Sequence, residues 1–547
     1  MADRRLGRAV VVVTGAAIGA AFFAWIAGAR VLAPGEIGWT MKLDWRIHFL
    51  GWHFFRSEPW HWPPGLIEGY YHAPDGTAIG FTDSIPLAAF VLKPFARWLP
   101  MPFQYLGAWM LFCFALQGAF GVLIARVWTA RWPLHLLSAA LFVLMPTLLM
   151  RVGHPALCAH WLLLWAIWRY VRKPPPRSWN LIEQASLGLL AGLVHPYLAV
   201  MVLAVLTALA VRDWRDERAG ARPPLQAVAG LSTAVGAVLV GWWASGLFSG
   251  APGGSLATEG LGTYSMNLLA PLTPTGWSLF LPELPLGAPG QTFEGFQYLG
   301  AGNLALVVVA AVLAWRARHT LPWAAIGPVA IVASICAVYA LSPRVTLGSL
   351  VLVNYGGDWL EPLAIFRATG RFFWPAAYLL LAGAVMLTVT RLRWTAAVLT
   401  LGLAVALQVV DLHGAHAERH DTSRDPAFHA WDMPLQSAFW QETLPRYRHL
   451  VLVGPEQCGH APLGFEAPAY LAGLHGLTIN AGEVARPSEP ARRAYCESLI
   501  ARVEAGSLDA ASLYIVDSFY RPLFDRADVR CEDVDGVTVC AANDGGR

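Results

Sequence analysis

Long apolar runs, separated by short charged or proline-rich segments, fill the chain up to residue 411. A helix needs about 20 apolar residues to cross a bilayer. Runs near that length occur at 9–32, 104–125, 133–150, 155–171, 224–247, 300–315, 321–341, 372–390 and 394–411. A further run, 181–211, is too long for one span, and its His195-Pro196 predicts two short helices that turn there. The pattern predicts an α-helical polytopic membrane protein with about eleven transmembrane helices.

Between and after these runs lie longer segments of mixed character. Residues 33–103 and 248–299 are long loops, and the tail 412–547 has ordinary soluble composition. In the tail, "RHLVLVGPEQ" and "ASLYIVDS" predict short buried strands, and "EPARRAYCESLIARVEAG" predicts a helix between them. We therefore expect a transmembrane domain over 1–411 and a small soluble α/β domain over 412–547. No catalytic signature marks the tail, which favours a lid, docking or acceptor-presenting role for it.

Composition agrees with a membrane protein, because 56% of the residues are hydrophobic and 14% are charged. A net charge of +3 does not indicate a nucleic-acid partner. The basic residues between the runs fall on one face of the predicted topology. They are Arg4, Arg5, Arg8, Arg126, Arg131, Arg169, Arg172, Lys173, Arg177, Arg212, Arg215, Arg218, Arg316, Arg318, Arg391 and Arg393. The positive-inside rule makes that face cytoplasmic, together with the N-terminus.

The first 30 residues admit two interpretations. Arginines precede an apolar run that ends in small residues, as in a signal peptide. The run is too long for a signal-peptide core, so an uncleaved first span is favoured. We then expect the long loops and the tail to lie outside, on the periplasmic or another extracytoplasmic side.

The cysteines support an extracytoplasmic tail. Cys113, Cys158 and Cys336 lie in or next to apolar runs and are interpreted as buried apolar residues. In "CEDVDGVTVC" the Asp535-Gly536 turn predicts a two-residue hairpin that sets Cys531 opposite Cys540, close enough for a disulfide. The remaining tail cysteines, Cys458 and Cys496, are left to pair with each other. Disulfides are typical of an oxidising compartment.

The stretch "MKLDWRIHFLGWHFFRSEPWHWPPG" follows the first run and mixes charges with tryptophans. Residues 41–56 predict an interfacial helix with Asp44 and His48 on one face. Its aromatic side chains would face lipid, and they are Trp45, Phe49, Trp52 and Phe55. One interpretation is a simple amphipathic anchor; the other is that Asp44 meets a substrate at the membrane surface. His53, His61 and His72 match no standard zinc spacing and are interpreted as interface residues.

Several strings carry a resemblance to a known group of membrane enzymes. They are "GWHFFRSEPWHWPPG", "GFTDSIPLAAFVLKPF", "RVGHPALCAHWLLLWA", "GLVHPYLAV", "FEGFQYLGAGNL" and "IFRATGRFFWPAAYLL". With the first-loop acid and the outer tail, they make residues from about 10 to 411 resemble the GT-C superfamily of polyprenyl-phosphate-sugar-dependent glycosyltransferases, through a bacterial family of GT-C-like membrane proteins. The resemblance implies inverting transfer of a sugar from a lipid phosphate to an acceptor, which needs a base and stabilisation of the departing phosphate.

Two outer acids are the candidates for catalysis. The resemblance matches Asp44 to the first-loop acid and implies that it is the base that takes the acceptor proton. Asp83, in "GFTDSIP", is either a second functional acid or a helix N-cap or turn residue. If both act, Asp44 and Asp83 would orient the acceptor or hold a divalent cation such as Mg²⁺ or Mn²⁺. The first loop has no adjacent acidic pair, which weakens the case for a metal.

Basic residues near the outer surface are the candidates for the donor phosphate. Arg367 and Arg371 in "IFRATGRFFW" are four apart, so a helix would place both on one face. The alternative for this pair is a snorkelling role. Other outer donors are Arg151, His154 and His195, each of which alone is more often structural. For contacts to sugar or acceptor the candidates are His48, Glu294 and Tyr298.

Two competing function classes stay open. A transporter or flippase for a lipid-linked saccharide would need ionisable residues within spans, and the spans are nearly free of acids. A non-catalytic envelope-assembly protein would tolerate loss of Asp44. The absence of GxxxxGK[ST] and of GxGxxG after a strand disfavours a soluble nucleotide-sugar donor. The expected partners are a polyprenyl-phosphate-linked sugar, membrane lipids, and an acceptor that is a glycan, a lipid or a protein.

Overall fold

The computed structural model describes residues 2–71, 76–220, 225–249, 260–454, 464–487 and 489–543. The chain forms two compact units. The helical unit comprises residues 1–31, 107–241 and 256–425, and the α/β unit comprises residues 32–106, 242–255 and 426–547. The chain therefore enters the α/β unit three times. Each unit is described by itself.

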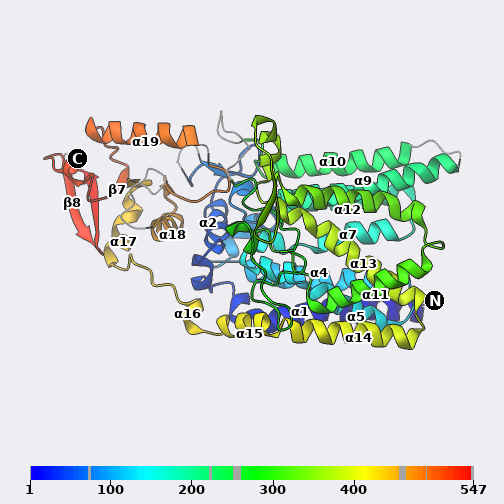
Figure 1. Cartoon of the computed structure of the whole chain (residues 1–547). Helices are drawn as coiled ribbons and strands as arrows, with labels where there is room; N and C mark the ends of the chain where they lie inside the picture. Colours follow the sequence, from blue (N-terminus) through cyan, green and yellow to red (C-terminus); the bar gives the residue numbers. More distant parts are fainter. Residues whose placement is uncertain are drawn as a thin grey trace. The chain divides into compact units, whose positions relative to one another are not determined.

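The helical unit is a bundle whose long helices run side by side with similar axis directions (Figure 1). Its helices are α1 (Ala2–Ala27), α4 (Leu106–Ala125), α5 (Trp132–Val143), α6 (Pro146–Met150), α7 (Trp161–Val171), α8 (Arg177–Val194), α9 (Pro196–Ala219), α10 (Leu225–Ala244), α11 (Ala301–Ala317), α12 (Trp323–Leu341), α13 (Trp374–Arg391), α14 (Trp394–Asp411) and α15 (His413–Thr422). Every predicted apolar run corresponds to at least one of these helices, and both 133–150 and 181–211 correspond to two.

Membrane-length helices are present, as expected. Within the described residues seven helices are long and apolar enough to cross a membrane, or eight if the bent pair α5 and α6, with a 43° angle, is one span. The expected number of about eleven spans is higher because it also included α7, α8 and the shorter apolar helix α11. These three do not meet the same criteria of length and apolarity.

The break at His195-Pro196 lies where the sequence predicts it. Helix α8 ends at Val194 and α9 begins at Pro196, because proline lacks the N–H that a continuous helix would need. His195 is extended, and its Nδ1 accepts a hydrogen bond of 3.2 Å from the Tyr197 N–H. The two helices have 18 and 24 residues. They are thus longer than the two short helices that the sequence indicated.

Small residues bring α1 and α4 together. A Cβ added to Gly19 would lie 1.8 Å from the Phe114 carbonyl oxygen, and one added to Gly118 would lie 2.0 Å from the Gly15 carbonyl oxygen. Neither position has room for a side chain. Such close backbone contact is a usual way to pack helices where lipid provides no hydrophobic drive between them.

Several short elements join the long helices of this unit. The 3₁₀ turns are η5 (Arg151–Gly153), η6 (Pro155–Cys158), η7 (Pro289–Thr292), η8 (Asp358–Phe366) and η9 (Thr369–Phe373). Strands β3 (Arg344–Leu347) and β4 (Leu350–Asn354) form an antiparallel hairpin. Of the candidate residues of the unit, Arg151 lies in η5 and Arg371 lies in η9, and His154, Glu294 and Arg367 lie within two residues of one of these turns.

The α/β unit is built on a five-stranded sheet. Its strands are β5 (His449–Val453), β6 (Thr478–Ile479), β7 (Ser512–Val516), β8 (Val529–Val534) and β9 (Val537–Ala542), in the order β6-β5-β7-β9-β8. Strands β6, β5 and β7 are parallel, and β9 and β8 extend the sheet antiparallel. Helices α18 (Glu466–His475) and α19 (Glu489–Glu504) make the crossovers. The two predicted tail strands and the predicted helix are confirmed as β5, β7 and α19.

The remaining elements of this unit come mainly from the first long loop. They are η2 (Gly38–Met41), α2 (Trp45–Phe55), β1 (Leu66–Ile67), β2 (Thr77–Ala78), η3 (Ile79–Phe81), α3 (Pro86–Leu92), η4 (Lys93–Trp98), α16 (Pro426–His429), α17 (Ala438–Thr443), η10 (Leu444–Arg446) and η12 (Arg521–Phe524). The loop binds the tail directly: Ile479 N–H donates to Gly69 O at 2.9 Å, and Ala485 N–H donates to Phe81 O at 2.7 Å.

Helix α2 exists where the sequence predicts it, but its environment differs from the prediction. All four aromatic residues expected to face lipid are buried within the protein: Trp45, Phe49, Trp52 and Phe55. Protein surrounds the helix on nearly every side, and His53 stacks between Phe49 and Tyr470 of α18. The amphipathic pattern was wrong as an indicator of lipid contact because other parts of the first loop, which pack on Trp52 and Phe55, and the distant tail, which packs on Trp45 and His53, together cover this helix.

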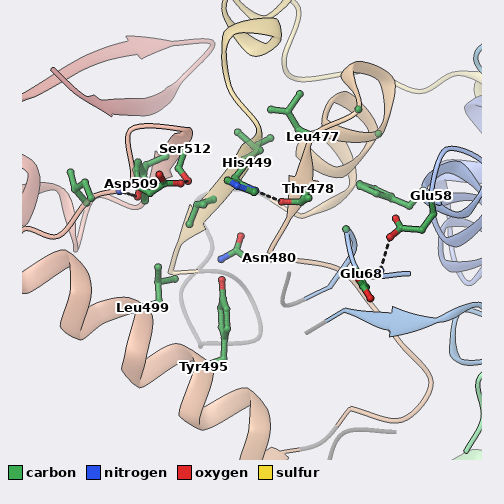
Figure 2. A pocket seen from close by; sticks show the side chains of 18 of the residues that line it. Glu58, Glu68, His449, Leu477, Thr478, Asn480, Tyr495, Leu499, Asp509 and Ser512 are labelled. Atoms are coloured by element: carbon green, nitrogen blue, oxygen red, sulfur yellow. Dashed lines mark hydrogen bonds between the residues drawn. The ribbon is translucent and has the colours of Figure 1, made fainter. Parts of the chain in front are cut away.

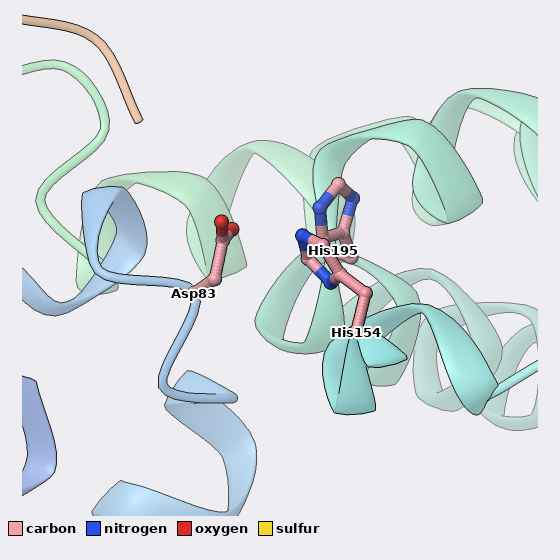
Figure 3. Close-up of side chains that lie close together, drawn as sticks. All are labelled: Asp83, His154 and His195. Atoms are coloured by element: carbon pink, nitrogen blue, oxygen red, sulfur yellow. The ribbon is translucent and has the colours of Figure 1, made fainter. Parts of the chain in front are cut away.

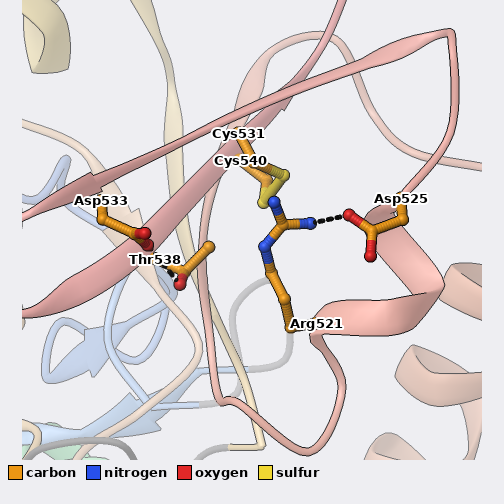
Figure 4. Close-up of a disulfide and its surroundings, with 6 residues drawn as sticks. All are labelled: Arg521, Asp525, Cys531, Asp533, Thr538 and Cys540. Atoms are coloured by element: carbon orange, nitrogen blue, oxygen red, sulfur yellow. Dashed lines mark hydrogen bonds and ion pairs between the residues drawn. A yellow bond between two sulfur atoms is a disulfide. The ribbon is translucent and has the colours of Figure 1, made fainter.

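The hairpin of β8 and β9 carries a disulfide (Figure 4). Val534 pairs with Val537, and Asp535 and Gly536 have positive φ values of 50° and 79°, as a two-residue type I′ turn requires. This register sets Cys531 opposite Cys540, and the two are bonded with a Cα–Cα distance of 4.1 Å. Cys496 is also disulfide-bonded, whereas its predicted partner Cys458 lies outside the described residues. Cys113, Cys158 and Cys336 are free and buried, as expected.

Candidate functional site

A buried cluster of charges ties three short elements of the helical unit together. Arg151 begins η5, Glu294 follows η7, and Arg371 lies in η9. Arg371 Nε and Nη2 donate to the two Glu294 oxygens at 2.6 and 2.5 Å, and Arg151 Nη1 donates to Oε2 at 2.9 Å. The three residues are 2%, 7% and 8% exposed in chain order. Because planar guanidinium groups match a carboxylate, the cluster is rigid and well ordered.

Charge is not balanced within this cluster. Burial alone would raise the pKa of the Glu294 carboxyl, but Arg371 and Arg151 outweigh burial and hold its pKa well below the usual range. One ionised carboxylate then faces two guanidinium groups, which leaves one positive charge. An anion such as a phosphate would complete the balance.

Aromatic rings also contact the two arginines of the cluster. Arg371 lies 4.7 Å over the Tyr197 ring, and Arg151 lies 5.2 Å from Phe293 and 5.7 Å from Trp374. Such contacts strengthen when the cation is removed from water. The sequence indicated the arginines but not their aromatic neighbours, which come from three different segments.

His154 and His195 meet in the helical unit, as Figure 3 shows. Their ring centroids are 5.7 Å apart with a 74° angle, and both side chains are buried. His154 lies close enough to Glu294 to lower the pKa of that carboxyl, although less than the arginines do. The structure therefore brings four of the five predicted phosphate-binding residues into one neighbourhood, and they are Arg151, His154, His195 and Arg371.

Arg367 lies apart from this buried group. The sequence placed it on one helix face with Arg371, but two separate 3₁₀ turns, η8 and η9, replace the continuous helix. Arg367 is consequently exposed, whereas Arg371 is buried. The Arg367 guanidinium lies 5.7 Å over the Tyr264 ring. It is the predicted phosphate ligand with access to solvent.

Tyr298 and Glu294 were candidates for the same contact, but they belong to different networks. The Tyr298 hydroxyl donates to Asp411 Oδ2 at 2.7 Å, and the Ala301 N–H donates to the same oxygen at 2.8 Å. Ser278 donates to the other Asp411 oxygen. Tyr298 and Asp411 are fully buried. This network fastens the start of α11 to the end of α14.

Asp44 and Asp83 lie in the α/β unit. Asp44 directly precedes α2 and is half-buried, and its carboxylate does not cap the helix. His48 is fully buried, and its Nδ1 lies 2.9 Å from the backbone oxygen of Asp44 rather than from the carboxylate. Asp83, drawn in Figure 3, has a φ of 52° and precedes α3. Ile85 occupies the N-cap position of α3, so Asp83 does not cap that helix, but it lies in a turn, which was the other structural alternative.

An apolar groove of about 680 Å³ runs along the helical unit. Helices α7, α12 and α13 supply most of its lining, with Arg212 of α9 and Ala314 of α11. On α13 the lining extends from Ala376 to Leu387, which spans about 17 Å at 1.5 Å per residue. Phe373, the last residue of η9, also lines the groove, two residues after Arg371.

The α/β unit contains a cavity of about 620 Å³ that the sequence did not indicate (Figure 2). Residues of β5, β6, β7 and α19 line it, together with Glu58 and Glu68 of the first loop. Glu58 and Glu68 also form a group of metal-ligating atoms with His61. Glu58 and His61 form a Glu-x-x-His spacing in the sequence, but this pair does not indicate a metal site without Glu68.

Two family models match this chain. The first, described as a domain of unknown function (DUF6311), covers residues 16–413, and the second, the DUF6311 C-terminal domain, covers residues 439–542. No curated protein matches the chain. Because the first match spans well over half of the chain, this protein is a member of the DUF6311 family.

Proposed function

We propose that the protein is a membrane glycosyltransferase of GT-C type that moves a sugar from a polyprenyl-phosphate-linked donor to an acceptor at the outer face of the bacterial inner membrane. The observation that carries the proposal is the apolar groove of about 680 Å³, whose lining includes Phe373 of η9, two residues after Arg371. A long apolar tail and an anionic head are the two parts of a lipid phosphate, and groove and arginines are complementary to them.

The lipid tail has a physical reason to enter the groove. Membrane-length helices α12 and α13 line it, so the tail would replace other apolar chains without exposing polar groups to lipid. The groove is open enough at Gly383 of α13 that a Cβ there would meet nothing within 4 Å. An isoprenoid chain is branched and flexible, which suits an irregular groove.

The donor phosphate would meet the positive end of this arrangement. The Arg151–Glu294–Arg371 cluster carries one positive charge in excess, and Arg367 is exposed close to it in sequence. A guanidinium group can donate two hydrogen bonds to a phosphate and would stabilise it as it departs. His154 and His195 would add donors once protonated.

The chemistry requires one base and no soluble nucleotide. The acceptor hydroxyl oxygen attacks the anomeric carbon, the bond from that carbon to the phosphate oxygen breaks, and the lipid phosphate leaves with the electron pair. Asp44 takes the hydroxyl proton, as an ionised carboxylate can at neutral pH. Attack from the face opposite the phosphate inverts the anomeric configuration.

Transfer of labelled sugar tests the proposal. Purified full-length protein in detergent micelles would be mixed with polyprenyl-phosphate sugars and membrane-derived acceptors, and labelled product would be measured. We expect Asp44→Asn to abolish transfer and Asp432→Asn, which changes an exposed acid, to leave it unchanged. Transfer that survives fully in Asp44→Asn would refute the assignment of the base.

The groove is tested by a matched pair of glycines. A Cβ at Gly383, which lines the groove, or at Gly402 of α14, which does not, would meet nothing within 4 Å. We expect Gly383→Phe to raise KM for the donor by about 10- to 70-fold, because two or three displaced methylene groups correspond to roughly 1.5–2.5 kcal/mol, and Gly402→Phe to leave KM unchanged. Equal effects in both variants, or no transfer from any lipid-linked donor, would favour the transporter or the assembly protein.

A further inference from the structure

Three side chains with metal-ligating atoms meet in the α/β unit. Glu58 and His61 follow α2, and Glu68 directly follows β1. One ligand atom from each lies within 4.8 Å of the others. His61 Nε2 is 3.1 Å from Glu58 Oε1, and His61 Nδ1 is 3.3 Å from Glu68 Oε1. These two contacts involve opposite nitrogens of the His61 ring, so an ion bound at one nitrogen would replace that contact with a carboxylate, while the other nitrogen keeps its own.

The backbone fixes the position of these carboxylates. The Glu68 N–H donates to Glu58 Oε1 at 3.0 Å, which joins the segment after α2 to the end of β1. The Glu58 side chain is 11% exposed, whereas the Glu68 side chain is 58% exposed. A Cβ added to Gly69 would lie 3.3 Å from Glu58 Oε2, so the chain approaches this carboxylate closely. One ligand is therefore held by the protein and the other stays reachable from solvent.

The cavity provides the second, independent observation. Glu58 and Glu68 line the same cavity of about 620 Å³, at the end away from Asp509 and Ser512 (Figure 2). His53 also lines it, is fully buried, and has no hydrogen-bond partner for Nδ1 within the described residues, while its Nε2 donates to Tyr470 O at 3.0 Å. A buried nitrogen without a partner is costly, and a polar ligand at this end of the cavity would reduce that cost.

The charges around Glu58, His61 and Glu68 also favour the binding of a cation. Two carboxylates face one imidazole, and the nearby charged group is Lys93, which acts on Glu58 electrostatically. The Lys93 ammonium is directed elsewhere: it donates to Pro59 O at 3.3 Å and lies 3.7 Å over the Phe55 ring. The carboxylates thus retain unused acceptor capacity on the cavity side.

We propose that Glu58, His61 and Glu68 bind one divalent transition-metal cation, Mn²⁺ or Zn²⁺, whose remaining coordination positions face the cavity. A nitrogen ligand favours these ions over Mg²⁺ and Ca²⁺, which prefer oxygen alone. One ring nitrogen of His61 binds the ion, and the other keeps a carboxylate partner, the usual arrangement for a metal-bound histidine. The site is distinct from Asp44 and Asp83, the pair that the sequence offered for a metal. It does not depend on glycosyl transfer.

Equilibrium metal binding tests the proposal. The full-length protein in detergent would be stripped with a chelator and titrated with Mn²⁺, followed by electron paramagnetic resonance, and with Zn²⁺ by equilibrium dialysis. We expect one ion per chain for at least one of the two metals. Glu68→Gln and His61→Asn should each weaken binding at least tenfold, and Glu504→Gln, an exposed carboxylate on α19, should not change it.

Retained structure would be checked on the same samples by the integrity of the Cys531–Cys540 disulfide and by circular dichroism. Because Glu68 is more than half exposed, Glu68→Gln keeps the test valid even if His61→Asn fails to fold. Absence of stoichiometric binding of both metals would overturn the proposal. Binding that persists in Glu68→Gln, or that Glu504→Gln weakens equally, would overturn it too.

Discussion

Glu294 is the residue on which the charge balance of the helical unit depends. Its carboxylate contacts both Arg151 and Arg371, and all three side chains are buried. Removing Glu294 leaves two adjacent buried cations, whereas removing one arginine leaves a neutral pair. The cost of a buried charge without a partner exceeds the gain from a well-formed ion pair. The three residues are therefore not equivalent, although each contributes to the same cluster.

The difference between Glu294 and the arginines predicts an order of stability for their variants. We expect Glu294→Gln to lower the free energy of unfolding by roughly 3–5 kcal/mol, and Arg151→Met to lower it by clearly less. The measurement is thermal and denaturant unfolding of the purified protein in one detergent, with Glu283→Gln, a partly exposed acid of the same unit, as the control. An equal or larger loss in Arg151→Met would show that hydrogen bonds, not net charge, govern the cluster.

Helix α2 shows how an element takes its role from a distant part of the chain. Its bounds could be predicted from local pattern, and so could the strands β5 and β7, α19 and the Asp535-Gly536 hairpin, because each depends on neighbours in sequence. The burial of α2 could not be predicted from local pattern, because residues distant in sequence, among them Tyr470 of α18, contact this helix. The candidate site in the helical unit could be predicted only in part for the same reason. Arg151 and Arg371 stood out as outer charges, but Glu294 as their shared partner follows only from tertiary packing.

The burial of α2 makes the α/β unit sensitive to acid. Burial lowers the pKa of His53 from 6.5 to about 4, with a smaller lowering by Arg56, although its contact with the Tyr470 carbonyl opposes the shift. Between these two values the unfolded chain binds a proton that the folded chain does not. Above about pH 6.5 both states are unprotonated at His53, and the free energy of unfolding has its full value. As the pH drops toward 4, the free energy of unfolding falls by roughly 3 kcal/mol in total.

Replacing the imidazole isolates this contribution. We expect His53→Gln, whose amide keeps a donor for Tyr470 O, to flatten the pH dependence of stability between about pH 6.5 and 4. Hydrogen–deuterium exchange of peptides from α2 and α18 at pH 7 and pH 5 measures it, with the exposed His413→Gln as the control. An unchanged slope in His53→Gln would assign the acid sensitivity to other groups.

For the whole molecule, the composition of the α/β unit constrains the topology. Residues 32–106, 242–255 and 426–547 form one compact unit, so all three must lie on the same side of the membrane. The chain must then cross an even number of times between residues 106 and 242, and again between 255 and 426. With the single crossing of α1, the total is odd. The expected eleven spans satisfy this condition, but eight do not.

The condition assigns a role to α11. Between residues 255 and 426 three helices have membrane-spanning length and apolarity, namely α12, α13 and α14, and three is an odd number. We therefore expect helix α11 to be the fourth crossing. Its 17 residues extend about 26 Å, close to the roughly 30 Å of a hydrocarbon core. Crossing puts the loop at Thr320, between α11 and α12, on the side opposite to the α/β unit.

Cysteine accessibility in intact spheroplasts tests this assignment. In a background without the free cysteines Cys113, Cys158 and Cys336, a membrane-impermeant maleimide should label Gln436→Cys of the α/β unit and should label Thr320→Cys only after permeabilisation. Both residues are exposed, so a lack of reaction reports on the membrane and not on burial. If α11 does not cross, Thr320→Cys reacts before permeabilisation. With three crossings between residues 255 and 426, the tail would lie on the side of the membrane opposite to residues 32–106 and 242–255. These three segments could then not form one α/β unit.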